Sequence, residues 1–310
     1  MTMITIDQAL QSVKSANLTA LEAQLLLLHA LGRNTQDRAW LLAHGDESLS
    51  PQTLATFQSG IQKRIDHVPL SYVLGQKEFY GLSLQVDPRV LDPRADTETL
   101  VDWALSFLKD PPITPGKEGQ QVLDLGTGSG AIALAIKANA VHCSIFASDN
   151  SQEALDVAQS NAVNLGLSVQ FIKSYWFEAW RDPAPQGHSL DLTLERNDNL
   201  ALWPSLPERF DLIVSNPPYI APNDPHLKHL VHEPLQALVA QEEGMSDLRC
   251  IVHQATNHLK PGAWLLLEHG YDQSQAVRQM LLDAGYENAQ SRSDLAGIER
   301  CTGAQWPKMK

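Results

Sequence analysis

The first part of the chain has apolar residues three or four positions apart, which is the spacing of amphipathic helices. The clearest series is Leu18, Leu21, Leu25 and Leu28. Further along, Ser50 precedes Pro51, and a small polar residue followed by proline is typical of a helix start. This pattern predicts a small all-helical domain over residues 1–70.

Short β-like runs replace the helical spacing between residues 71 and 95. One run includes Phe79 and the other covers residues 82–86, and Gly81 lies between them. We expect a β-hairpin here that connects the helical domain to the rest of the chain.

From residue 96 to residue 310, apolar runs of strand length alternate with stretches of helical spacing. The expected strands are residues 121–125, 144–148, 169–172, 210–215 and 263–268, with a closing pair near 287–292 and 300–306. The expected helices are residues 97–108, 131–139, 152–164, 247–259 and 273–284. This alternation predicts an α/β fold with a mostly parallel sheet, whose ligands bind at the carboxyl ends of the strands. Residues 181–208 show neither spacing, and we expect an inserted surface loop there.

Charge and cysteine content narrow the class of protein. The 310 residues include 23 Lys and Arg against 36 Asp and Glu, and the net charge of −13 disfavours binding to the phosphates of a nucleic acid. The 3 cysteines lie far apart, which indicates a reducing compartment. No apolar run approaches the roughly 20 residues of a membrane span, and the first residues lack the basic segment of a secretory signal. We expect a cytoplasmic protein with no membrane partner.

A glycine-rich turn follows the first strand of the sheet. It carries the glycines Gly126, Gly128 and Gly130, and such a turn lets the backbone pass close to a ligand. The spacing differs from the G-x-G-x-x-G of nicotinamide sites, and tight turns without a ligand can also carry G-x-G-x-G. Asp124, just before the turn, suits a ligand that bears an ammonium group.

The next two strands also end in residues that suit a nucleoside. Asp149 could accept hydrogen bonds from both hydroxyls of a ribose, or it could cap the helix that follows; we favour the ribose. The third strand runs into Tyr175, Trp176 and Phe177, whose rings could stack on adenine or pack in the core. For Phe177 we expect core packing.

The fourth strand ends in the most specific motif of the chain, Asn216-Pro217-Pro218-Tyr219. Two consecutive prolines remove backbone donors and stiffen the turn, so carbonyl oxygens stay unpaired. Asn216 adds a side-chain carbonyl and Tyr219 adds a ring face. Together these groups can accept two N–H hydrogen bonds from a planar amide or amino group and hold it for reaction.

The pairing of this motif with the glycine-rich turn resembles the class I S-adenosylmethionine-dependent methyltransferases that modify a planar nitrogen. More narrowly, the chain resembles the HemK/PrmC family, the peptide chain release factor glutamine methyltransferases. The segments that carry this likeness are residues 75–81, 93–98, 232–238 and 265–270, besides the two motifs. The resemblance implies a Rossmann-like class I methyltransferase fold with a small helical N-terminal domain. It also implies S-adenosylmethionine as cofactor, with S-adenosylhomocysteine as product.

The resemblance assigns roles to residues of this sequence. The implied cofactor-binding residues are Gly126, Thr127, Gly128, Ser129, Gly130, Asp149, Trp176 and Asn216. The implied substrate-binding residues are Asn216, Pro217, Pro218 and Tyr219, of which Asn216, Pro217 and Tyr219 are catalytic. The chain departs from the family pattern at Ala95, where a second proline is usual, and at Tyr175, where an acidic residue is usual. The insertion at residues 181–208 is the third departure.

The implied reaction is methylation of the side-chain amide nitrogen of the glutamine in the Gly-Gly-Gln motif of release factors, by a monomer that holds no stable nucleic acid. Three alternatives remain. The first is adenine-N6 methylation of DNA or RNA, in which residues 216–219 would hold a flipped base, and the second is glutamine methylation of a ribosomal protein. The third is a cofactor-binding scaffold without enzymatic activity. The net charge disfavours the first. The sequence Asp96-Thr97-Glu98 resembles the release-factor branch, which disfavours the second.

Two clusters of polar residues have no assigned role in the implied methylation reaction. Arg94, Asp96 and Glu98 could be the charged start of a helix or a wall of the substrate cleft. The histidines His226, His229 and His232 have the spacing of one helix face, but no cysteine or fourth histidine completes a metal site. We expect no metal.

Overall fold

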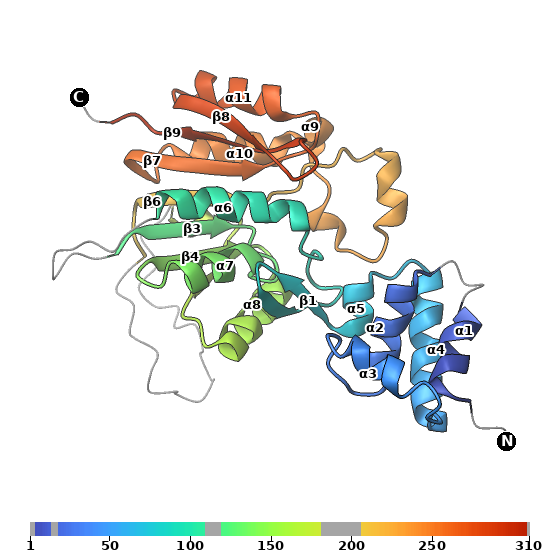
Figure 1. Cartoon of the computed structure of the whole chain (residues 1–310). Helices are drawn as coiled ribbons and strands as arrows, with labels where there is room; N and C mark the ends of the chain where they lie inside the picture. Colours follow the sequence, from blue (N-terminus) through green and yellow to red (C-terminus); the bar gives the residue numbers. More distant parts are fainter. Residues whose placement is uncertain (1–3, 14–17, 109–118, 181–205, 309–310) are drawn as a thin grey trace.

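The computed structural model describes residues 4–13, 18–108, 119–180 and 206–308 (Figure 1). Its helices and strands form two units, a helical unit near the N-terminus and a larger unit built on a sheet. Most of the predicted insertion, residues 181–205, lies outside the described residues. Within the described part of the chain, no helix is long and apolar enough to cross a membrane.

The N-terminal unit is helical, as the apolar spacing predicts, but the expected face of its second helix is only partly right. Leu28 is buried, whereas Leu21 is exposed and Leu26 and Leu27 are buried in its place. The helices of this unit are α1 (Ile6–Ser12), α2 (Ala20–Ala30), α3 (Arg38–Ala43), α4 (Pro51–Ile65) and α5 (Leu70–Leu74). Thr5 and Thr19 each form a capping box with the residue three positions on, and the Ser50 hydroxyl caps α4 ahead of Pro51, as predicted. Residues from four of the helices, Ile6, Leu26, Leu41 and Phe57 among them, are buried in one apolar core.

The segment between the units is part helix and part hairpin. The prediction placed its start at residue 71, whereas Leu70–Leu74 form α5, whose apolar side chains pack on the helical core. Strands β1 (Gln76–Phe79) and β2 (Leu82–Gln85) then form the predicted antiparallel hairpin. Asn161 of the sheet unit hydrogen-bonds both the N–H and the carbonyl of Gln85, at 2.6 and 3.0 Å, so the hairpin belongs structurally to the sheet unit.

The sheet unit contains seven strands in the order β5-β4-β3-β6-β7-β9-β8. Their bounds are β3 Gln121–Leu125, β4 Ser144–Asp149, β5 Gln170–Lys173, β6 Phe210–Ser215, β7 Leu259–Glu268, β8 Glu287–Ser293 and β9 Glu299–Gln305. The first five in this order are parallel, and β9 and β8 are antiparallel additions at one edge. The predicted α/β fold with a mostly parallel sheet and a closing pair is therefore confirmed.

Helices cover both faces of this sheet (Figure 1). The longer helices of the unit are α6 (Glu98–Phe107), α7 (Ala131–Asn139), α8 (Gln152–Leu165), α10 (Ser246–Ala255) and α11 (Ser274–Asp283), and α9 (Gln241–Gly244) is a short turn. Alternate strand residues point to opposite faces, so Val122 packs in the core with α6 and α7, while Leu123 packs in the core with α10 and α11. Because β3 to β6 are parallel, the residues that follow them lie along one edge of the sheet.

Candidate active site

A pocket of about 290 Å³ lies at the carboxyl edge of the sheet, where four strands end. It brings together residues that the sequence placed at four separate strand ends, namely Gly126 and Gly128 after β3, Asp149 at the end of β4, Trp176 after β5, and Asn216 and Pro218 after β6. The pocket therefore joins the predicted cofactor residues and part of the predicted substrate motif in one cavity.

The three glycines of the turn have different tasks. Gly126 has φ +72°, and a Cβ there would meet the Trp176 ring at 3.4 Å, so a side chain at this position would stand between the turn and the pocket wall. Gly128 also lines the pocket. Gly130, with φ +83°, begins α7, and a Cβ there would lie only 3.2 Å from that of Ala158 on α8. Gly130 thus allows two helices to approach closely.

Thr127 and Ser129, which were also predicted to bind the cofactor, have buried side chains and do not line the pocket. The Thr127 hydroxyl donates to Asp124 Oδ2 at 2.6 Å, and the Ala133 N–H donates to the same oxygen at 3.2 Å. Asp124 is fully buried, and burial raises its pKa to about 7. Asp124 therefore fixes the turn to the start of α7 and does not line the pocket, while its other oxygen, Oδ1, has no hydrogen-bond partner within the described residues.

Asp149 lines the pocket and is held on both oxygens. Oδ2 accepts a hydrogen bond from the Gly128 N–H and Oδ1 accepts one from the Ser151 N–H, each at 2.9 Å. The cap of α8 is Ser151, whose hydroxyl accepts from the Ala154 N–H, so the alternative role of Asp149 as helix cap is filled by a neighbour. Burial raises the pKa of Asp149, and the backbone donors oppose this shift. Each carboxylate oxygen retains a lone pair for a further donor.

Trp176 forms one wall of the pocket. Its backbone is in the left-handed region, with φ +46°, and its side chain is 8% exposed. The indole Nε1 donates to Asp247 Oδ1 at 3.2 Å. Tyr175 beside it is 44% exposed and also lines the pocket, whereas Phe177 is fully buried and stacks on His258, as expected for a core residue.

Asp247 also lines the pocket, although it is not among the site residues predicted from the sequence. It lies in the first turn of α10 and lines the pocket beside Trp176. Burial raises its pKa, while hydrogen bonds from its neighbours oppose the shift. The only signal in the sequence was an acidic residue at a helix start, which is ordinary there because of the helix dipole.

The Asn216–Tyr219 segment is divided between the pocket and its supporting wall. Asn216 and Pro218 line the pocket, and the Asn216 side chain donates through Nδ2 to the Thr97 hydroxyl at 3.3 Å. Pro217 is buried. The Tyr219 hydroxyl donates to Glu268 Oε1 at 3.4 Å, so its ring lies against the sheet and is not part of the pocket lining.

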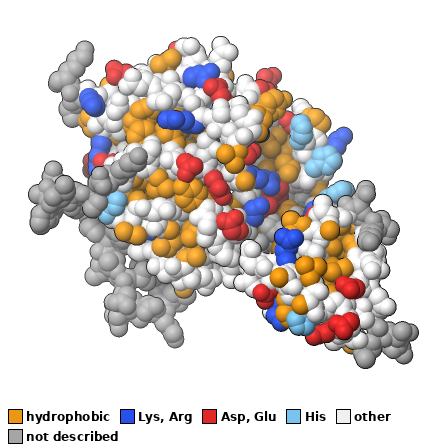
Figure 2. Space-filling view, in the orientation of Figure 1, with side chains coloured by type: hydrophobic (Ala, Val, Ile, Leu, Met, Phe, Trp, Pro, Cys, Tyr) orange, Lys and Arg blue, Asp and Glu red, His pale blue; other side chains and the backbone are white. Residues whose placement is uncertain are grey.

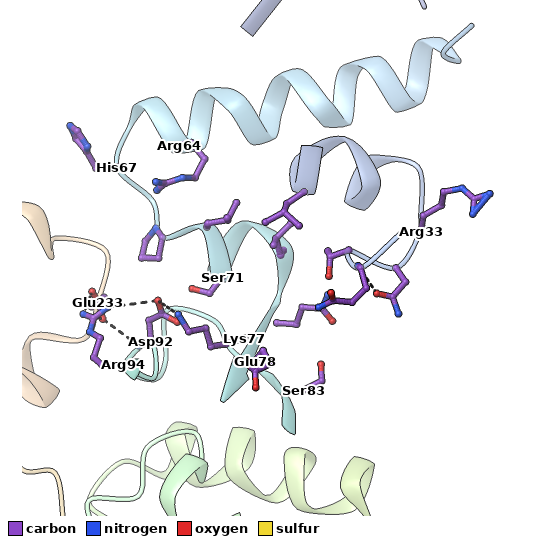
Figure 3. Close-up of a pocket in the computed structure, with 18 of the residues that line it drawn as sticks. Arg33, Arg64, His67, Ser71, Lys77, Glu78, Ser83, Asp92, Arg94 and Glu233 are labelled. Atoms are coloured by element: carbon purple, nitrogen blue, oxygen red, sulfur yellow. Dashed lines mark hydrogen bonds and ion pairs between the residues drawn. The ribbon is translucent and has the colours of Figure 1, made fainter. Parts of the chain in front are cut away.

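A second cavity, of about 920 Å³, lies between the helical unit and the sheet unit (Figure 3). Arg33, Arg64 and His67 contribute to it from the helical unit. On the opposite side, the Arg94 guanidinium pairs with Glu233 at 2.7 Å, and Asp92 lies between Arg94 and Lys77. Residues of both units line this cavity, and several of them are charged.

The predicted charged cluster is separated in the structure. Arg94 faces the large cavity and pairs with Glu233, whereas Asp96 pairs with Arg300 at 3.7 Å. Glu98, at the start of α6, accepts a hydrogen bond from the Tyr80 N–H at 2.9 Å. Only Arg94 therefore belongs to a cavity wall.

The three spaced histidines also have separate partners. His226 hydrogen-bonds Asp224, His232 hydrogen-bonds the Asp66 carbonyl, and the His229 ring lies edge-on to His67. In the part of the chain that the structure describes, no group of three or more His, Cys, Asp or Glu side chains could hold a metal ion.

Comparisons with known proteins agree with this division into two units. A family model described as the PrmC N-terminal domain matches residues 5–75, and one described as a methyltransferase domain matches residues 116–303. The release factor glutamine methyltransferase of Xylella fastidiosa strain Temecula1 is 40% identical over 302 residues, which cover 96% of this chain and 98% of the relative.

Two further relatives have the same name. The protein of Coxiella burnetii is 38% identical, with 96% of this chain and 98% of the relative covered, and that of Escherichia coli is 36% identical, with 96% of each covered. Among solved structures, the hMettl16 catalytic domain has a TM-score of 0.51 at 16% identity, with 81% of this chain and 82% of that chain covered. At that identity the structural likeness concerns the fold alone.

Proposed function

The chain belongs to the family of release factor glutamine methyltransferases, and from this premise we propose that the pocket at the carboxyl edge of the sheet, here called the strand-edge pocket, binds S-adenosylmethionine. The Asn216–Tyr219 segment, here called the clamp, holds the glutamine amide beside it. The enzyme transfers the methyl group to the side-chain amide nitrogen of a release-factor glutamine. The observation that carries the proposal is the position of Asn216 and Pro218 in the same cavity as Gly126, Asp149 and Trp176.

The residues of the pocket fit this cofactor. The left-handed backbone at Gly126 leaves open a space that a side chain would occupy. The fixed carboxylate of Asp149 can accept from two ribose hydroxyls. Trp176 offers a ring face for adenine, and the Asp247 carboxylate beside it can accept from the adenine amino group, which is the task of the acidic residue that Tyr175 replaces.

The chain's own residues prepare the amide for methylation. Bound S-adenosylmethionine supplies an electrophilic methyl group. An amide nitrogen is a weak nucleophile because its lone pair is delocalised, so the protein must position it and stabilise the positive charge that develops on it. The side-chain oxygen of Asn216 and the carbonyl oxygen of Pro217 accept the two N–H bonds of the amide. These hydrogen bonds strengthen as the charge develops, and this lowers the barrier. The methylated nitrogen then releases one of its two protons to solvent, which leaves the neutral N-methyl amide.

Replacing Asp149 by alanine should weaken S-adenosylmethionine binding, because charge-assisted hydrogen bonds to the ribose are lost. We expect a dissociation constant roughly 10- to 100-fold higher, measured by calorimetry. Asp211→Ala is the matched control. That carboxylate accepts from the Gln121 N–H and pairs with Lys260 at the other end of the strands, so its loss should lower Tm and leave the dissociation constant unchanged. An unchanged constant in Asp149→Ala would assign Asp149 a purely structural role.

The helical unit recognises the release factor in this proposal. Its described residues do not line the pocket at the carboxyl edge of the sheet, yet they form one wall of the cavity of about 920 Å³ between the two units. On the face shown in Figure 2, acidic and basic side chains are interspersed around the junction of the two units, which suits a folded protein better than a polyanion.

A protein that begins at Gln76 tests this role. The boundary is placed there because α5 packs on the helical core, while the hairpin is fixed to Asn161. We expect this shortened protein to bind S-adenosylmethionine with nearly the affinity of the full chain and to methylate the intact release factor poorly. Equal rates on the release factor would contradict the assignment.

We further propose that the protein acts as a monomer in the cytoplasm and holds no nucleic acid stably. The cysteines Cys143, Cys250 and Cys301 form no disulfide among the described residues, which supports a reducing compartment. The net charge of −13 supports the absence of a nucleic-acid partner.

A further inference from the structure

Two connecting segments supply part of the lining of the strand-edge pocket. Residues 89–91, here called the first wall segment, lie between β2 and α6, and all of them line the pocket. Residues 234–239, here called the second wall segment, follow the clamp and line the pocket through Pro234, Gln236, Ala237 and Val239. Neither segment belongs to the seven-stranded sheet, so contacts outside the sheet must hold each of them in place.

The first wall segment is anchored at its centre. The Val90 side chain is buried and packs with Ala154 and Val157 of α8. The Val90 carbonyl also accepts a hydrogen bond from the Tyr72 hydroxyl of α5. The first wall segment therefore has a fixed place beside the pocket.

The second wall segment lacks an apolar anchor at its start. Val231 and Leu235 are 66% and 64% exposed, whereas Glu233, which lies between them, is only 7% exposed. His232 hydrogen-bonds the Asp66 carbonyl, so it ties this stretch to the helical unit and not to the pocket. A buried carboxylate is costly unless it is paired, and the partners of Glu233 therefore decide where the segment lies.

The partners of Glu233 directly follow the first wall segment (Figure 3). Arg94 Nη2 donates to Oε1 and Oε2 of Glu233 at 2.7 and 2.8 Å, and the Asp92 N–H donates to Oε2 at 3.3 Å. The Asp92 carboxylate lies 3.6 Å from Lys77 and 3.7 Å from Arg94. Two positive and two negative side chains are thus gathered here, and they tie the start of the second wall segment to the end of the first.

This ion pair lies directly behind the pocket lining. Leu91 and Pro234 line the strand-edge pocket, while their neighbours Asp92 and Glu233, together with Arg94, line the large cavity between the two units. If the pair is broken, the start of the second wall segment loses its attachment to the first, and the lining can open between Leu91 and Pro234.

We propose that Arg94 and Glu233 are positioning residues that hold the two wall segments together and keep the strand-edge pocket closed around bound S-adenosylmethionine. The inference rests on the proposed function because it takes this pocket as the cofactor site. It gives a role to Arg94, the one member of the predicted charged cluster that lies in a cavity wall.

The test measures how fast S-adenosylhomocysteine leaves the full-length chain, by a chase of the labelled compound, and its dissociation constant, by calorimetry. Glu233→Gln keeps the size of the side chain, but its NH₂ must face either Arg94 or the Asp92 N–H, and both of these are donors. We expect dissociation about 10-fold faster and a dissociation constant about 10-fold higher, the rise that follows when the closed arrangement falls to about a tenth of the molecules.

A double variant shows whether the two side chains act as one unit. Arg94→Gln should speed dissociation to a similar degree as Glu233→Gln. The double variant should dissociate no faster than either single variant, because it leaves neither charge unpaired. Effects that add up in the double variant would overturn the proposal, because the two residues would then act independently.

The methylation assay separates pocket closure from a general loss of structure. The KM for S-adenosylmethionine should rise in Glu233→Gln, while the single-turnover rate at saturating cofactor and release factor stays within about twofold of the wild-type rate. A general loss of structure would lower that rate as well, and such a result would overturn the assignment.

Glu22→Gln is the matched control. It breaks an ion pair of the same length, Arg64 to Glu22 at 2.7 Å, that lies within the helical unit and away from the strand-edge pocket. It should lower Tm and leave the dissociation rate unchanged. A Glu233→Gln chain that releases S-adenosylhomocysteine no faster than Glu22→Gln would overturn this inference alone, whereas a wild-type chain that binds neither the cofactor nor its product would contradict the proposed function as well.

Discussion

Asn216→Ala should lower kcat for release-factor methylation by an amount that corresponds to about 2–4 kcal/mol in the barrier, the usual effect of removing one polar group that stabilises developing charge. Asn216 lines the pocket, and its only side-chain hydrogen bond among the described residues runs from Nδ2 to Thr97. Its oxygen remains for the substrate. The loss should appear in kcat because the contact strengthens in the transition state.

The measurement is single-turnover methylation at saturating S-adenosylmethionine. Asn139→Ala is a suitable control, because Asn139 donates to the Ala135 carbonyl at the far end of α7 and has no place in the pocket. It should keep the wild-type rate. An Asn216→Ala enzyme with a near-normal rate would show that the clamp does not use this side chain.

Gly244→Ala should lower kcat for release-factor methylation because the new methyl group would displace the Asn216–Tyr219 segment. Gly244 has φ +86°, and a Cβ there would lie 2.1 Å from the carbonyl oxygen of Tyr219, a backbone atom that cannot move alone. The two preceding residues, Glu242 and Glu243, are also left-handed, so the segment is already strained. The added methyl group must displace the end of the Asn216–Tyr219 segment. A displacement of about 1 Å at a catalytic site can cost about 100-fold in rate.

Gly285→Ala is the control that separates the two effects of Gly244→Ala, namely the strain of an alanine with a left-handed backbone and the steric clash with the Tyr219 carbonyl. Gly285 has φ +91°, but nothing lies within 4 Å of its added Cβ. Both variants should lose stability from the left-handed backbone, of order 1 kcal/mol. Only Gly244→Ala should also lose kcat, measured by the same methylation assay and compared with Tm from thermal unfolding. Equal kcat in the two variants would show that the carbonyl of Tyr219 is not coupled to catalysis.

The sequence predicted the elements and the pocket residues for the same physical reason. Apolar spacing identified strands β3 to β6, and parallel strands bring their carboxyl ends to one edge. Residues as far apart as Gly126, Asp149 and Asn216 could thus be expected in one cavity, where the structure places them. The residue types in each motif then indicated which part of a ligand each residue could contact.

The supporting contacts could not be predicted because they join distant segments through side chains. Asn216 donates to Thr97 and Tyr219 donates to Glu268, and no spacing in the sequence relates the two partners of either bond. The same holds for Asp247 beside Trp176. These positions depend on the register of the sheet and on how a helix start packs against a strand end.

Asp124 shows that a local pattern in the sequence can be compatible with more than one role. An acidic residue before a glycine turn is compatible with a ligand contact, but the side chain at that strand position points to the face covered by α7. There it accepts from Thr127 and Ala133, and the backbone of the turn gains its shape from these bonds. Strand alternation decided the outcome.

The central claim is that this chain methylates the glutamine of a release factor, and mass spectrometry of the acceptor tests it most directly. The wild-type chain is incubated with S-adenosylmethionine and, in parallel, with a purified release factor, its Gln→Ala variant at the Gly-Gly-Gln motif, a ribosomal protein and duplex DNA. We expect a mass gain of one methyl group on the Gly-Gly-Gln peptide alone, located on the glutamine side chain and absent from the variant. Methylation of the DNA or of the ribosomal protein at a comparable rate, with the Gly-Gly-Gln peptide unchanged, would contradict it.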